Sequence, residues 1–159
     1  LVTLSSAFGN APAGLAADPR VRGRLSPAWL DSLGRSMNVY PQGDLAVSSA
    51  CVRELRDAGV DILAGSDVSE PLPMLGGLAH GASLHHELQL LVEAGLSPVE
   101  ALRSATSVPA RRFSLPDRGR IVPGARADLL LVDGDPTSTI SDTLSTRAVW
   151  RRGVRQPAG

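Results

Sequence analysis

The spacing of apolar residues changes along the chain. Up to about residue 115, apolar positions recur at intervals of three and four, which is typical of helices that bury one side. Beyond it, short apolar runs alternate with turn signals such as Asp133-Gly134, which is typical of β-strands. The pattern predicts an α/β chain with one part over residues 1–115 and a small β part over residues 116–159.

Several helix ends can be read from single residues. Asp44 is placed to cap a helix that Gly59 ends. Ser97 and Glu100 have the spacing of a capping box. Ser83 is expected to cap the helix that follows it, on whose surface the adjacent histidines His85 and His86 are expected to lie.

The helix between Asp44 and Gly59 is expected to bury one apolar side. The single cysteine lies on this side and cannot form a disulfide within the chain, so it is expected to be a small buried residue. The residues of this side are Leu45, Val47, Cys51, Leu55 and Ala58.

Two apolar runs predict buried strands, and one of them ends on a carboxylate. The runs are Leu1–Leu4 and Val60–Ala64, and the second continues directly into "GSD", Gly65 to Asp67. In a parallel α/β sheet, ligands meet the protein at the C-terminal ends of the strands. A carboxylate there can bind a metal ion or face a reacting water, with Ser66 hydrogen-bonded to it. On the tripeptide alone, a turn-capping aspartate is the better explanation.

Composition and charge narrow the function classes. The chain of 159 residues is 43% hydrophobic and has a formal net charge of +0, so it lacks the basic footprint of a nucleic-acid-binding protein. All sixteen basic residues are arginine, which excludes Schiff-base lysine chemistry and a P-loop lysine. No apolar run approaches the length of a membrane span.

Four segments follow one another along the chain. The two most specific are "EAGLSPVEALRSAT" and "GRIVPGARADLLLVDGDP", with "GVDILAGSD" before them and "AVWRRGVR" after them. Together, from Val60 to Arg155, they resemble the C-terminal part of the amidohydrolase superfamily, in particular its imidazolonepropionase-like and Xaa-Pro-dipeptidase-like branch.

The resemblance implies a (β/α)8 barrel with a small composite β-sandwich, and a site with one or two divalent metal ions, usually zinc. Asp67 matches the aspartate that ends the eighth barrel strand of the family. The resemblance therefore implies that Asp67 binds metal and, as a catalytic residue, accepts the proton of the metal-bound water. His80 follows in the loop after this strand and is expected to contact substrate. An exposed loop histidine without a role is an equally good explanation.

One departure from the family pattern is large. No His-X-His precedes Asp67, since all three histidines follow it, and a barrel of this type takes about 250 residues. The chain is therefore expected to be a C-terminal fragment with about the last two barrel strands, inactive alone. A non-catalytic module that packs on a partner supplying the other strands is the alternative.

The function expected for the intact enzyme is hydrolysis of an amide, cyclic amide or peptide-like C–N bond by a metal-activated water. Its expected partner is a small-molecule substrate, with neither nucleic acid nor membrane involved. A homo-oligomeric state and a cytoplasmic location are further expectations.

Overall fold

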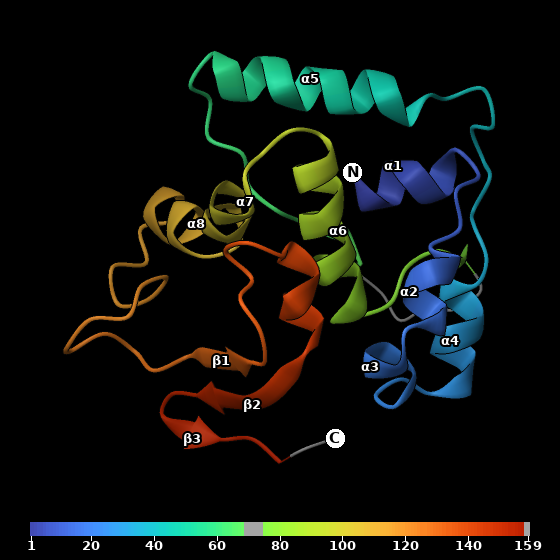
Figure 1. Ribbon diagram of the computed structural model, residues 1–159. Helices are drawn as coiled ribbons and strands as arrows, with labels where there is room; N and C mark the ends of the chain where they lie inside the picture. The colour runs from blue at the N-terminus through green and yellow to red at the C-terminus, as the bar shows by residue number, and fades with distance from the viewer. Residues whose placement is uncertain (69–74, 158–159) are drawn as a thin grey trace.

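The computed structural model describes residues 1–68 and 75–157, which form a set of helices and a small sheet (Figure 1). The strands and the 3-10 helix all follow residue 128: β1 (Leu129–Val132), η2 (Ile140–Leu144), β2 (Thr146–Arg151) and β3 (Val154–Arg155). The α-helices are α1 (Val2–Ala7), α2 (Ala13–Ala17), α3 (Pro19–Arg22), α4 (Pro27–Leu33), α5 (Leu45–Asp57), α6 (Ala82–Glu93), α7 (Pro98–Ser104) and α8 (Ser107–Arg112).

Helix α6 lies at the centre of this arrangement. Helices α1 to α4 lie on one side of it, α7 and α8 on the other, and the sheet lies beyond η2 (Figure 1). Two apolar clusters form the core, and both α6 and η2 contribute to each of them. The first cluster contains Leu15, Val21, Leu33, Ala79, Ala82 and Leu144. The second contains Leu88, Leu91, Leu96, Ala101 and Ile140.

A buried carboxylate joins α6 to α1. Glu87 is 4% exposed, and its side chain accepts hydrogen bonds from the Val2 amide at 2.7 Å and from the Leu1 nitrogen at 3.0 Å. These contacts satisfy backbone donors at the start of α1, which have no partner inside the helix. They also pair the negative charge of Glu87, whose burial without a partner would cost free energy.

The sheet is antiparallel with the order β1-β2-β3. The segment "TRAVWRRGVRQ" predicts a hairpin around Arg152-Gly153, and the structure confirms it. Strands β2 and β3 are joined through Arg152 and Gly153, whose φ angles are 53° and 79°. Positive φ at both central residues belongs to the two-residue turn whose twist matches that of paired strands. The structure thus has β-strands where the alternating pattern predicted them after residue 115.

The prediction of strands at Leu1–Leu4 and Val60–Ala64 is wrong. Val2–Ala7 is a helix, and Val60–Ala64 is not part of any sheet among the described residues. The Ala64 amide donates to the Ser104 carbonyl at 2.9 Å, which fixes the end of this segment against α7. A strand needs neighbouring strands to satisfy its backbone groups. Because the described residues place none beside these segments, one forms internal helical hydrogen bonds and the other remains unpaired.

Helix α5 has the predicted ends but packs through a different side. Asp44 caps it, accepting from the Ala46 amide at 2.7 Å, and Gly59 follows it with a φ of 75°. Its predicted apolar side faces outward, however: Val47 is 67% exposed, and Cys51, predicted to be buried, is exposed as well. The contacts with the core come from Val52 instead, on another side of the helix.

The N-terminal half of α6 also differs from expectation. Gly81, not Ser83, occupies the N-cap position, and the Ser83 hydroxyl accepts from the Ala79 amide at 2.9 Å. His85 and His86 are half-buried, although they were expected on the surface. The Nδ1 atoms of both rings are buried and have no hydrogen-bond partner in the described part of the chain. Burial lowers the pKa of both imidazoles, and Arg24 and Arg20 lower that of His85 further.

The capping box at the start of α7 is confirmed. The Ser97 hydroxyl accepts from the Glu100 amide at 3.2 Å, and the Glu100 carboxylate accepts from the Ser97 amide at 2.7 Å. Within residues 1–68 and 75–157, no helix has both the length and the apolar character needed to cross a membrane.

The exposed apolar side of α5 predicts self-association of the chain. Val47→Asp combined with Leu55→Asp should weaken the association constant at least tenfold, because each side chain contributes about 1.5–3 kcal/mol when fully buried. The measurement is the molecular mass by light scattering over a range of concentrations. Ala28→Asp, on the exposed surface of α4, is the matched control and should leave the association unchanged. An unchanged association in the double variant would show that another surface is responsible.

The buried imidazoles predict that the free energy of unfolding falls as the pH drops below 6.5, the ordinary pKa of histidine. Below this pH the unfolded chain binds protons that the folded chain, with its lowered pKa values, does not bind, so protonation favours unfolding. Urea titrations between pH 8.5 and 5.5 should show this decline. His85→Gln combined with His86→Gln should make it shallower, while both proteins should have the same pH slope above pH 7.5. Equal pH slopes of the two proteins below pH 6.5 would show that His85 and His86 do not cause the decline in stability.

Candidate functional site

Asp67 lies where the extended segment after α5 ends. Its side chain is exposed, and its φ of 53° places the backbone in the left-handed region, which aspartate tolerates better than most residues. The Thr3 hydroxyl donates to the Ser66 carbonyl at 3.1 Å. This contact ties α1 to the peptide that directly precedes Asp67 and holds the backbone from which the carboxylate projects.

The residues before Asp67 only partly match the expectation. Within the described residues, no hydrogen bond joins the Ser66 side chain to the Asp67 carboxylate. The backbone around Gly65 is open, because a Cβ added there would have no atom within 4 Å. The carboxylate is therefore accessible to a ligand, but its neighbours along the chain do not hold it.

His80 lies at the start of α6 and lines a pocket of about 320 Å³. The Trp29 ring contacts the His80 ring edge to face, with the ring centroids 5.8 Å apart and the planes at 80°. Trp29 thus orients the ring of His80. The other polar side chains of this pocket, referred to below as the His80 pocket, are Arg20, Arg24, His85 and Thr146.

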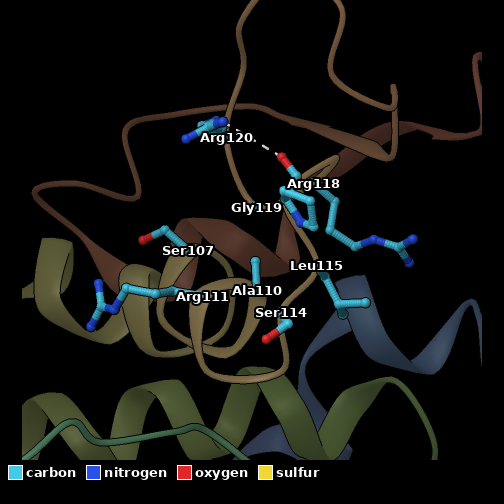
Figure 2. Close-up of a pocket in the computed structure, with 9 residues that line it drawn as sticks. Ser107, Ala110, Arg111, Ser114, Leu115, Arg118, Gly119 and Arg120 are labelled. Carbon is cyan, nitrogen blue, oxygen red and sulfur yellow. Dashed lines mark hydrogen bonds between the residues drawn. The ribbon is translucent and has the colours of Figure 1, made fainter.

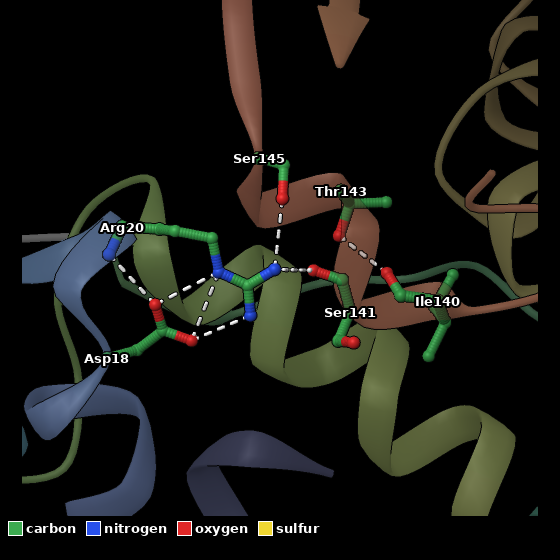
Figure 3. A network of polar contacts seen from close by, with 6 residues as sticks. All are labelled: Asp18, Arg20, Ile140, Ser141, Thr143 and Ser145. Atoms are coloured by element: carbon green, nitrogen blue, oxygen red, sulfur yellow. Dashed lines mark hydrogen bonds and ion pairs between the residues drawn. The ribbon is translucent and has the colours of Figure 1, made fainter. Parts of the chain in front are cut away.

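A polar network fixes one wall of the His80 pocket (Figure 3). The Arg20 guanidinium donates to both carboxylate oxygens of Asp18, and its Nη1 donates to the Ser145 hydroxyl at 3.0 Å and the Ser141 carbonyl at 3.1 Å. The hydrogen bond with Arg20 lowers the pKa of Asp18, and the same bond raises the pKa of Arg20. The network therefore links α3 to η2 with both charges in place at neutral pH.

The structure does not bring the two predicted site residues to a common pocket. Asp67 is not among the residues that line the His80 pocket. Nor do the described residues contain a group of three or more His, Cys, Asp or Glu side chains that could hold a metal ion. The part of the chain that the structure describes does not by itself fit a metal site, because a catalytic zinc takes three protein ligands.

A larger hollow of about 530 Å³ lies between α8 and the loop that follows it (Figure 2). Three arginines line it, but Arg111, Arg118 and Arg120 point in different directions (Figure 2). Arg111 pairs with Asp61 at 2.7 Å, and Arg118 pairs with its neighbour Asp117 at 2.8 Å. Side chains that diverge and are already paired do not form a common binding site.

Sequence reasoning missed the partners of both candidate residues. The Thr3 hydroxyl contacts a carbonyl 63 positions away, and Arg24 lines the same pocket as His80 although it is far from it in the sequence. The apolar pattern around His85 carried no signal of this neighbourhood, because helical periodicity reports burial and not the identity of the facing residues.

Comparison with known proteins gives this geometry its context. The family model described as "Amidohydrolase family" matches residues 29–154. The imidazolonepropionase of Streptomyces griseus subsp. griseus is 31% identical over 140 residues, which cover 82% of this chain and 34% of that protein. The adenine deaminase of Methanoregula boonei is 46% identical over 68 residues, covering 43% of this chain and 12% of that protein. The chain thus spans about a third or less of the length of these relatives.

The chain is also similar in structure to solved hydrolases. Molinate hydrolase is similar with a TM-score of 0.59 and 25% identity, covering 81% of this chain and 30% of that one. A Xaa-Pro dipeptidase with bound methionine has a TM-score of 0.60 and 24% identity, covering 98% of this chain and 34% of that one. The likeness supports a TIM-barrel-type hydrolase fold with mixed helices and strands. The family match extends over most of the sequence, and the chain belongs to the amidohydrolase family.

Proposed function

We propose that this chain is part of a hydrolase that cleaves C–N bonds of amide, cyclic amide or peptide-like small molecules. The observation that carries the proposal is the family match over residues 29–154, a range that includes both Asp67 and His80. The names of the relatives, adenine deaminase and imidazolonepropionase, support the same class of bond.

In this proposal, Asp67 supplies one carboxylate to a metal site and accepts a proton from the attacking water. Family members generally use divalent metal ions, and zinc is the ion proposed here. Such an ion supplies a water whose pKa is lowered to about 7. The exposed side chain of Asp67 and the open backbone at Gly65 support this role. The remaining ligands must come from outside the described residues.

His80 is the proposed substrate contact. Its imidazole lines a pocket of ligand size, and Trp29 holds the orientation of the ring. A ring oriented by an edge-to-face contact loses less conformational freedom when it binds a ligand. The boundary at residue 115 between a barrel part and a β part belongs to the same proposal.

One observation favours a second candidate, a non-catalytic module that packs on a partner. The described residues bring no group of three or more potential metal ligands together, as a partner-dependent module would allow. The two candidates differ in whether Asp67 works with ligands supplied by the remainder of an enzyme.

The 159-residue chain alone should bind zinc at well below one equivalent and should not hydrolyse dipeptides or lactams. The reason is that only one proposed ligand is among the described residues, against the three that a catalytic zinc requires. The zinc bound per chain is measured by metal analysis after gel filtration, for the wild type and for Asp67→Asn. One equivalent of zinc that Asp67→Asn loses would show that this chain assembles a complete ligand set by itself.

In the complete enzyme, Asp67→Asn should reduce kcat by about 10²–10⁴-fold or more, because general-base assistance alone has this size. Asparagine tolerates the left-handed backbone at this position, so the loop should keep its conformation. Steady-state kinetics and metal content are measured together.

The matched control for this change is Asp57→Asn, an exposed aspartate at the end of α5. It removes the same charge and should leave both kcat and metal content unchanged. Wild-type turnover and full metal in Asp67→Asn would show that Asp67 is only a turn residue, which would remove the catalytic assignment.

A further inference from the structure

We propose that the His80 pocket binds a small molecule with an apolar body and one carboxylate group. The proposal deepens the proposed function by naming the chemical class that this pocket takes, and it rests on that function only for the ligand's role as a substrate. The binding itself stands on the walls of the pocket and on their charges.

The body of the pocket is apolar and formed by three separate parts of the chain. Val21 and Leu25 come from α3 and the loop after it, Leu144 comes from η2, and Leu130 and Val149 face each other across β1 and β2. Val21 and Leu144 are themselves buried, so they form a firm floor. The volume of about 320 Å³ is near the lower end of the range for small-molecule sites, roughly 300–1,000 Å³.

Among the described residues, the charges around the pocket have one sign, because none of those that line it carries a carboxylate. Asp18 already neutralises Arg20 (Figure 3). Arg24 makes no ion pair within the described residues. Its Nη2 donates to the Thr146 carbonyl at 2.6 Å, and its guanidinium makes no other hydrogen bond within these residues. Arg24 is therefore a cation at the rim with donors available to an anion.

The imidazole of His85 adds a neutral polar atom to the same pocket. The Nδ1 atom of His85 is buried without a partner among the described residues, and burial together with Arg24 lowers the pKa of this ring. His85 therefore stays neutral at pH 7, so Arg24 remains the charged group that a ligand meets. The N-terminus of the twelve-residue helix α6 begins at this pocket and adds a further preference for an anion.

An apolar pocket with a cation at its edge favours an apolar carboxylate over an uncharged apolar molecule and over a small polar anion. An uncharged apolar molecule would leave Arg24 without an anion, and a small polar anion such as acetate would leave the apolar floor uncovered. A charge-assisted hydrogen bond and the burial of an apolar ring each contribute to binding, so a molecule that offers both should bind best.

The experiment is equilibrium dialysis of the 159-residue chain against benzoate, with benzamide and acetate as matched probes. Benzoate should bind at least about tenfold more tightly than either. Benzamide loses the charge-assisted hydrogen bond to Arg24, and acetate loses the burial of the apolar ring. Arg24→Gln should weaken benzoate binding by about the same factor and leave benzamide binding unchanged.

Arg22→Gln is the control, since this exposed arginine of α3 is not among the residues that line the pocket. It should leave benzoate binding unchanged. Equal binding of benzoate and benzamide, binding of acetate as tight as that of benzoate, or equal losses in Arg22→Gln and Arg24→Gln would each overturn the proposal.

The failure of this inference can be told apart from failure of the proposed function. Asp67→Asn should bind benzoate like the wild type, because Asp67 does not line the pocket. Benzoate binding that depends on Arg24 supports the inference even when the complete enzyme shows no C–N hydrolysis. Hydrolysis that persists while the isolated chain fails to bind benzoate would overturn the inference alone.

Discussion

The packing of α6 against the rest of the chain is the constraint on which the other elements depend. Both apolar clusters include residues of this helix, and its buried Glu87 accepts the first backbone donors of α1. Its N-terminal end also forms part of the His80 pocket. A shift of α6 would therefore disturb the core, the orientation of α1 and the pocket together. Because Thr3 of α1 holds the peptide before Asp67, the same shift would reach the candidate carboxylate.

Features that depend on neighbouring residues could be predicted from the sequence, and features that depend on distant ones could not. The capping box at Ser97 and the hairpin at Arg152 are complete within a few residues, so their residue types determine them. The strand predicted at Val60–Ala64 would have needed neighbours that a local pattern does not supply. For α5, the apolar spacing correctly indicated a helix. The side of the helix that packs depends on the elements around it, however, and Cys51 is exposed.

For the candidate site too, the sequence indicated single residues but not the contacts between distant parts of the chain. Asp67 could be proposed because the family resemblance and the preceding apolar run both point to it. The contact of Thr3 with the peptide before Asp67 joins parts of the chain that are far apart in sequence. So does the pocket that Arg24 lines together with His80 and His85. A histidine pair on a helix reads as surface in a one-dimensional pattern, whereas the structure buries the Nδ1 atoms of both rings.

The left-handed backbone at Asp67 limits which residues can ever replace it. Only glycine, asparagine and aspartate adopt this conformation readily, so the backbone restricts the position before any chemistry is considered. Glutamate keeps the charge but meets the backbone penalty and also carries its carboxylate one carbon farther out. Selection that preserves only the turn would therefore exchange Asp, Asn and Gly freely at this position, whereas selection for the carboxylate would leave aspartate alone.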